Sequence, residues 1–167
     1  TRVDVTEHSR MVIDEFIYDP NSGKGALSMR ATLGAVRYAS GQIAKNSRQR
    51  VNIRTPSATI SVRGTDFMML IDEVGSSMIT LLPSCNTQGL CVTGEIAVES
   101  DVGTVIMNQA FQTTVVNHRG SLPKKPVILA LPEDMLRAML IVRKTSPYDE
   151  IAEDAFEMID ILDVDFL

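Results

Sequence analysis

The stretch that decides the fold is residues 51–67, which read VNIRTPSATISVRGTDF. A short apolar strand at its start stops at Thr55-Pro56, because proline cannot donate a hydrogen bond to a strand ladder and belongs at an edge or a corner. Residues 58–63 then alternate in polarity, which is typical of a half-buried strand. One face of this run carries Ala58, Ile60 and Val62. Gly64 permits a bulge or a positive φ, so the stretch predicts strands joined at sharp corners.

Short strands are also predicted on both sides of this stretch. Residues 10–18 form an apolar and aromatic run that ends at a strong turn signal, 19–23. Residues 26–33 alternate, and Gly34 is expected to end that strand before another at 35–40. The strands expected further along are 66–72, 77–82, 95–99, 104–107 and 111–116. Many short strands punctuated by glycine predict a mainly β fold, a solenoid, a sandwich or a barrel. The lack of intervening helices disfavours a doubly wound sheet.

The character of the sequence changes after residue 117. We expect a β domain at 1–117, a proline- and glycine-containing linker at 118–131 and a small α-helical tail at 132–167. The last helix is expected to begin near Ser146-Pro147. Its apolar stripe consists of Ile151, Ala155, Met158, Ile159 and Leu162. Such an acidic amphipathic helix either lies on its own β core or docks onto a partner subunit.

Composition excludes several classes of protein. A chain of 167 residues that is 44% hydrophobic is neither disordered nor too short for a core. No apolar run approaches the roughly 18 residues of a membrane helix, so membrane insertion is not expected. The net charge of −5 divides into blocks: residues 20–65 hold eight bases and no acid, and residues 146–167 hold eight acids and no base. An acidic chain with few aromatic residues is not expected to bind nucleic acid. The blocks are either solvated faces or surfaces that pair within the chain or between copies of it.

Cys85 and Cys91 flank a segment that is predicted to be a hairpin loop. Cysteines on opposite sides of a hairpin can meet disulfide geometry, although free thiols are an equal alternative at this stage. Two sulfur atoms alone do not make a zinc site, which needs four ligands.

Few features of the sequence indicate catalysis. The chain has no nucleophile elbow and no phosphate-binding loop. His8 and Ser9 are neighbours on a predicted strand, so their side chains should point to opposite faces. Glu99 and Asp101 share a face but bracket a turn, and they lack the dense oxygen ligands of a calcium loop. The sequence therefore predicts a non-enzymatic protein with no metal, no cofactor and no small-molecule substrate.

Residues 51–67 resemble the FecR-domain family, whose signature is Thr-Pro-x-Ala-x-x-x-(Ile/Val)-Arg-Gly-Thr. The matching positions here are Thr55, Pro56, Ala58, Val62, Arg63, Gly64 and Thr65. The preceding run GAVRYASGQIAK at 34–45 and the later run GEIAV at 94–98 are similar to the family as well. The likeness covers about residues 3–116 and implies a non-enzymatic β module, solenoid-like in its coils. The motif itself is interpreted as structural. Arg63 either folds back onto carbonyl groups at the corner or forms an exposed charge pair.

The family resemblance leaves two functions open. FecR-like modules occur in structural proteins of phage virions, and the first hypothesis is a structural and assembly subunit, a homo- or hetero-oligomer with protein partners in a tail or capsid-associated complex. The alternative hypothesis is a periplasmic module of iron-uptake signalling, which relays the state of an outer-membrane transporter to a sigma factor.

Overall fold

The computed structural model describes residues 2–6, 8–19, 24–40, 50–85 and 90–130. All regular secondary structure in these segments is β-strand, which confirms the prediction of a mainly β fold. Residues up to Leu129 belong to one compact unit. The predicted tail at 132–167, with its two expected helices, lies outside the described residues.

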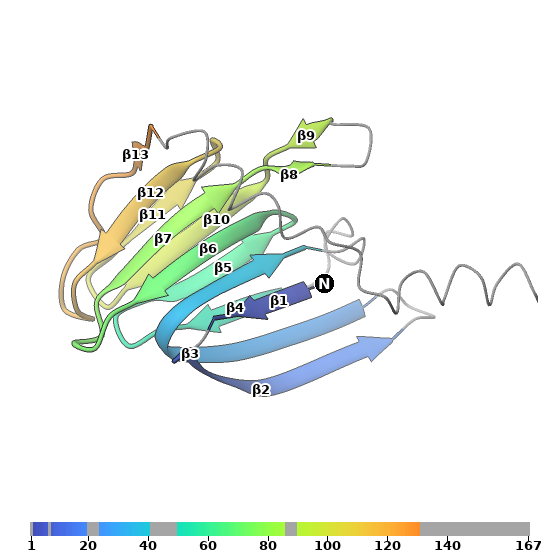
Figure 1. Cartoon of the computed structure of the whole chain (residues 1–167), viewed down its shortest axis with the longest axis horizontal. Helices are drawn as coiled ribbons and strands as arrows, with labels where there is room; N and C mark the ends of the chain where they lie inside the picture. The colour runs from blue at the N-terminus through green and yellow to red at the C-terminus, as the bar shows by residue number, and fades with distance from the viewer. Residues whose placement is uncertain (1, 7, 20–23, 41–49, 86–89, 131–167) are drawn as a thin grey trace, which may run out of the picture. The chain divides into compact units, whose positions relative to one another are not determined.

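One long strand, β3 (Lys24–Ala39), belongs to two parts of the sheet (Figure 1). Its first part pairs with β2 (Arg10–Asp19) and with β4 (Arg50–Arg54), and its second part pairs with β1 (Arg2–Val5) and β6 (Asp66–Ile71). The strand changes partners at Gly34, where φ is +89°. Sequence reasoning expected Gly34 to end a strand. That expectation is wrong, because a glycine at positive φ bends the backbone while its neighbours stay paired.

The strands on the two sides of Gly34 form two half-sheets. The order in the first half-sheet is β2, β3, β4, β5 (Thr59–Arg63), β10 (Glu95–Ser100) and β11 (Gly103–Met107). The order in the second half-sheet is β1, β3, β6, β7 (Ser77–Leu82), β12 (Gln112–Val116) and β13 (Val127–Ile128). A separate small hairpin pairs β8 (Ser84–Cys85) with β9 (Cys91–Val92).

The strands do not form a solenoid. Between the described strands, all pairings are antiparallel except that of β3 with β4, whereas a solenoid stacks successive coils as parallel neighbours. The sheet instead curls at β3, and a single hydrophobic core contains residues from both half-sheets. Ile53, Ile60 and Ile96 contribute from the first half-sheet. From the second come Phe67 and Ile79, and the Phe67 ring lies tilted against that of Tyr38, with the ring centroids 5.5 Å apart. The described strands thus form one curled sheet, a half-barrel, and a small separate hairpin.

The segment after β12 runs alongside that strand. The Lys124 N–H donates a hydrogen bond to the Val115 carbonyl (2.9 Å), and the Thr114 hydroxyl donates to the Lys124 carbonyl (2.6 Å). Pro123 is buried. Part of the predicted linker is therefore attached to the β unit. The division of the chain after residue 117 into a linker (118–131) and a helical tail (132–167) remains a prediction.

The bend of β3 is fixed by the turn between β1 and β2. The Ala35 carbonyl accepts hydrogen bonds from the Thr6 N–H (3.1 Å), the Thr6 hydroxyl (3.2 Å) and the Ser9 hydroxyl (3.4 Å). A Cβ atom at Gly34 would overlap the Ser9 side chain and lie 2.7 Å from the Ser9 Cα. Both the positive φ and this close approach require glycine.

We therefore expect Gly34→Ala to lower the free energy of unfolding by more than about 2 kcal/mol, because the substitution combines backbone strain with a clash. The matched control is Gly120→Ala, where an added Cβ meets only His118 at 3.5 Å. The control should change stability by less than about 0.5 kcal/mol. Urea unfolding midpoints measure both variants, and equal midpoints would contradict the role given to Gly34.

Candidate functional site

The first half of the family motif forms a tight turn between β4 and β5. The Thr55 N–H donates to the Ala58 carbonyl (2.8 Å), and the Ala58 N–H donates to the Thr55 hydroxyl oxygen (3.0 Å). Pro56 lies exposed in the turn, where its missing N–H leaves no donor unsatisfied. The Thr55 side chain is almost fully buried and closes the turn on itself.

Three buried hydroxyl groups connect this turn to the second half-sheet. The Ser57 hydroxyl donates to the Ser77 oxygen (2.7 Å), and the Ser77 hydroxyl donates to the Thr55 oxygen (2.8 Å). Ser57 and Ser77 have no exposed surface, and Ser77 begins β7. Sequence reasoning missed both serines, because their contact spans 20 residues and leaves no local pattern. The relay joins the ends of the two half-sheets.

The second half of the motif turns the chain from β5 to β6. Gly64 has a φ of +61°, and the Thr65 hydroxyl donates to the Leu82 carbonyl (3.3 Å). Arg63 is exposed and forms an ion pair with Glu95 (3.3 Å). Two roles were considered for Arg63, and the structure shows the exposed charge pair. This pair joins the basic block of the sequence to an acidic segment.

Asp66, which follows the motif, is buried and ties three segments together. Its carboxylate accepts hydrogen bonds from the Ser84 hydroxyl (2.7 Å) and the Ser40 N–H (3.0 Å), and Arg37 lies 4.0 Å away. A buried carboxylate needs such partners to offset its lost hydration. Asp66 therefore anchors the base of the β8–β9 hairpin, a role that its place in the sequence did not indicate.

The β8–β9 hairpin carries the two cysteines. Cys85 lies opposite Cys91 in the strand register, and the structure joins them in a disulfide. Leu90 and Val92 beside them are exposed. The hairpin therefore presents a cross-linked apolar projection next to Asp66.

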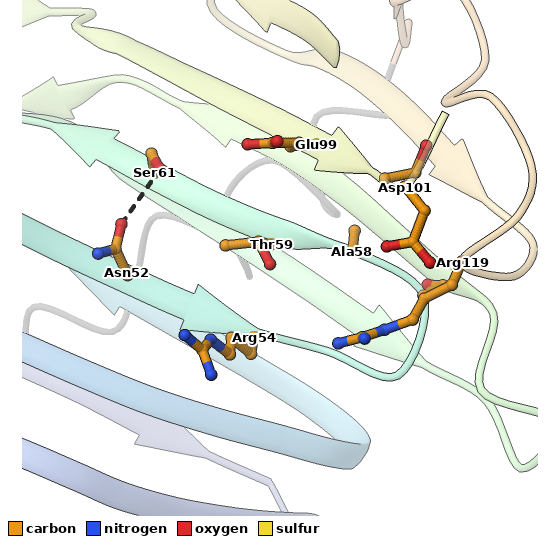
Figure 2. A pocket seen from close by; sticks show the side chains of 10 residues that line it. Asn52, Arg54, Ala58, Thr59, Ser61, Glu99, Asp101 and Arg119 are labelled. Carbon is orange, nitrogen blue, oxygen red and sulfur yellow. Dashed lines mark hydrogen bonds between the residues drawn. The ribbon is translucent and has the colours of Figure 1, made fainter. Parts of the chain in front are cut away.

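A polar groove of about 500 Å³ lies on the outer face of the first half-sheet (Figure 2). Its floor is formed by the outward-facing polar residues of β4 and β5, where the Ser61 hydroxyl donates to Asn52 Oδ1 (3.1 Å). Arg54 and Glu99 lie on opposite sides of the groove. Arg119 and Asp101 lie together at one end of it.

Both arginines of the groove are available for a ligand. Among the described residues, neither Arg54 nor Arg119 lies within ion-pair distance of a carboxylate. Arg119 comes from the turn after β12, where its carbonyl accepts a hydrogen bond from the Asp101 N–H (3.0 Å). The sequence did not point to Arg119, because only the fold brings this turn to the end of β10.

The groove has the chemistry of a binding surface. Its lining holds both signs of charge, hydroxyl groups and an amide, and neither histidine of the chain belongs to it. In the segments that the structure covers, no three carboxylate, histidine or cysteine side chains gather as a metal site. The same segments contain no helix with the length and apolarity of a membrane span. The predicted docking stripe, Ile151, Ala155, Met158, Ile159 and Leu162, lies outside the described residues.

A curled β sheet with a polar outer groove and a structural corner motif defines a class of mainly β modules. Residues 1–83 match the family model of FecR protein, and through this stretch, about half of its length, the chain belongs to the FecR family. The match includes the whole turn-and-corner motif at 55–65, as the sequence resemblance implied.

Two crystal structures of candidate anti-sigma factors from Parabacteroides distasonis are similar to this chain. Their TM-scores are 0.45 and 0.46, with 12% and 11% sequence identity. They align with 77% and 76% of this chain, which spans only 61% of each of them. No curated protein matches the chain. The family match favours the signalling hypothesis over the virion hypothesis, for which the comparisons give no support.

We expect Thr55→Val to lower the free energy of unfolding by about 1–3 kcal/mol, because the Ala58 N–H and the Ser77 hydroxyl would lose their buried acceptor. The control, Thr59→Val, changes a partly exposed residue of β5 and should cost less than about 0.5 kcal/mol. Chemical denaturation compares the two variants. Equal losses would show that the hydroxyl relay contributes nothing.

We also expect Cys85 and Cys91 to resist alkylation in the folded, unreduced protein and to react after reduction. Intact mass spectrometry with and without a reductant provides the measurement. Alkylation of both residues without prior reduction would contradict the disulfide.

Proposed function

We propose that this chain is a non-enzymatic protein-interaction module of periplasmic signalling, which receives the state of an outer-membrane transporter and passes it towards a sigma factor. The match of residues 1–83 to the FecR family carries the proposal. The disulfide between Cys85 and Cys91 supports an oxidising compartment such as the periplasm. The groove supports binding over catalysis, because its lining pairs no nucleophile with a base.

The polar groove is the surface that we assign to the transporter. Arg54 and Arg119 can bind carboxylates of a protein partner, and Glu99 and Asp101 can bind its basic side chains. A groove with both signs of charge orients a partner as well as attracting it, since reversed docking would place like charges together. The contact is therefore expected to be polar and sensitive to salt.

The C-terminal segment is the second contact in the proposal. Residues 146–167 carry eight acids and no base, with apolar residues at helical spacing. A segment of this kind can lay its apolar stripe into a partner's groove. We assign it to a protein partner other than the transporter, so that the module contacts two proteins at once.

A binding experiment with the full chain tests both assignments. The purified periplasmic domain of an outer-membrane transporter from the same organism is titrated onto the immobilised chain by surface plasmon resonance. Arg119→Glu should weaken binding about tenfold or more, because it places a negative charge where a partner carboxylate is expected. Deletion of residues 146–167 should leave this binding unchanged and should abolish capture of the second partner.

The control for Arg119 is Lys125→Glu, which makes the same charge change at an exposed residue that does not line the groove. The control should change the dissociation constant by less than about twofold. Failure of the unmodified chain to bind the transporter domain would contradict the proposed function. Equal effects of the two substitutions would contradict only the assignment of the groove.

A further inference from the structure

The groove on the first half-sheet is formed by three neighbouring strands and runs along the middle one. The strands β4 and β10 pair with opposite edges of β5 and supply the two walls. Because neighbouring strands lie about 4.8 Å apart, the two walls are separated by about 10 Å. The floor comes from β5 and the turn before it, with the small residues Ser57, Ala58, Thr59 and Ser61.

Charges of opposite sign face each other across this floor. Arg54 of β4 and Glu99 of β10 both lie opposite Thr59 in the strand register (Figure 2). On the same outer face, Arg63 and Glu95 lie on directly paired strands and form an ion pair. Arg54 and Glu99 are one strand further apart and form no ion pair within the described segments. Both charges therefore remain for a ligand.

The polar floor favours an extended partner segment over a helix. The Ser61 hydroxyl donates to Asn52 Oδ1, so the amide N–H groups of Asn52 remain to donate. The partly exposed Thr59 hydroxyl lines the same floor. A helix satisfies most of its backbone hydrogen bonds internally and docks through an apolar stripe. An extended segment brings backbone N–H and C=O groups that need partners, and these side chains can bind them.

We propose that the groove binds an extended segment of the partner protein, which runs along β5 with acidic residues towards Arg54 and basic residues towards Glu99. The backbone hydrogen-bonding groups of an extended chain point perpendicular to its side chains, and successive side chains point to opposite sides. When the backbone groups bind the floor, the side chains therefore face the two walls. The segment that is recognised consequently alternates in charge, with an acid at every second position and a base between.

The end of the groove continues this pattern. Asp101 lies two residues beyond Glu99, and the Arg119 carbonyl accepts a hydrogen bond from the Asp101 N–H. Residues two apart in an extended chain are separated by about 6.7 Å. The next base of the segment therefore comes to lie near Asp101, and its next acid near Arg119. Two acids and two bases in alternation match the four charges of the groove.

This inference rests on the proposed function only for the source of the segment, which is the transporter domain. Its own test uses synthetic peptides, so the two proposals fail separately. A chain that binds the transporter domain but does not distinguish the peptides contradicts the extended segment alone. A chain that distinguishes the peptides but does not bind the transporter domain contradicts the proposed function alone.

Nuclear magnetic resonance titration of the isotope-labelled full chain tests the inference with two capped peptides, Thr-Glu-Lys-Glu-Lys-Thr and Thr-Glu-Glu-Lys-Lys-Thr. The peptides share composition and net charge, but only the first places its acids on one side of an extended chain and its bases on the other. The first should bind at least about fivefold more tightly. It should also shift the amide signals of Asn52, Thr59 and Ser61. Equal affinities, binding of neither peptide, or shifts confined to other residues overturn the proposal.

Charge variants test the assignment of the two walls. Arg54→Glu should weaken binding of the alternating peptide about fivefold or more, because both walls then carry acids, and Arg54→Lys should retain binding. The matched control is Lys125→Glu, at an exposed residue outside the groove, which should change the affinity by less than about twofold. Arg54 is itself exposed, so its substitution is not expected to unfold the chain, and circular dichroism verifies this.

A double variant, Arg54→Glu with Glu99→Arg, exchanges the signs of the two walls. It should bind the alternating peptide more tightly than Arg54→Glu alone, because a peptide that runs in the reverse direction presents its acids to the opposite wall. A double variant as weak as the single one overturns the proposal, as does an equal loss of binding in Lys125→Glu.

Discussion

The bend of β3 at Gly34 is the constraint on which the rest of the structure depends. One side of this strand orders β2 and β4, and the other orders β1 and β6, so each half-sheet is built outward from the same backbone. The Ala35 carbonyl, with donors from Thr6 and Ser9, holds the bend in place. Because the half-sheets then face each other, their apolar sides share one core. Burial of this core is the main stabilising contribution.

The family motif holds together the two half-sheets that meet at the bend of β3. The turn at Thr55 and the relay through Ser57 and Ser77 join the ends of the two half-sheets, and the corner at Gly64 carries the chain from one to the other. These residues are buried or committed to backbone contacts, so their role is to support the module. The groove lies on the outer face of the same stretch, where Asn52, Arg54 and Ser61 line it, and it is the surface left for a partner.

Much of the fold could be predicted from local patterns, but the way the strands combine could not. Alternation in residues 58–63 correctly placed Ala58, Ile60 and Val62 on one face, and that face is buried in the core. The continuity of β3 through Gly34 was missed, since a glycine signals a break and a bend equally well. The solenoid was wrong because strand length and glycine spacing do not specify the direction of pairing. No periodic pattern in the sequence predicts the Ser57–Ser77 contact or the roles of Asp66 and Arg119, because each of these depends on residues far apart in the sequence.

The central claim of this account is that β3 unites the two half-sheets in a single cooperative unit. Native-state hydrogen exchange of the β3 amides tests it most directly, because local opening of either half would release only the amides on its own side. We predict that amides on both sides of Gly34 exchange together, at the free energy of global unfolding. Distinct exchange free energies for the two parts of β3 would contradict the claim.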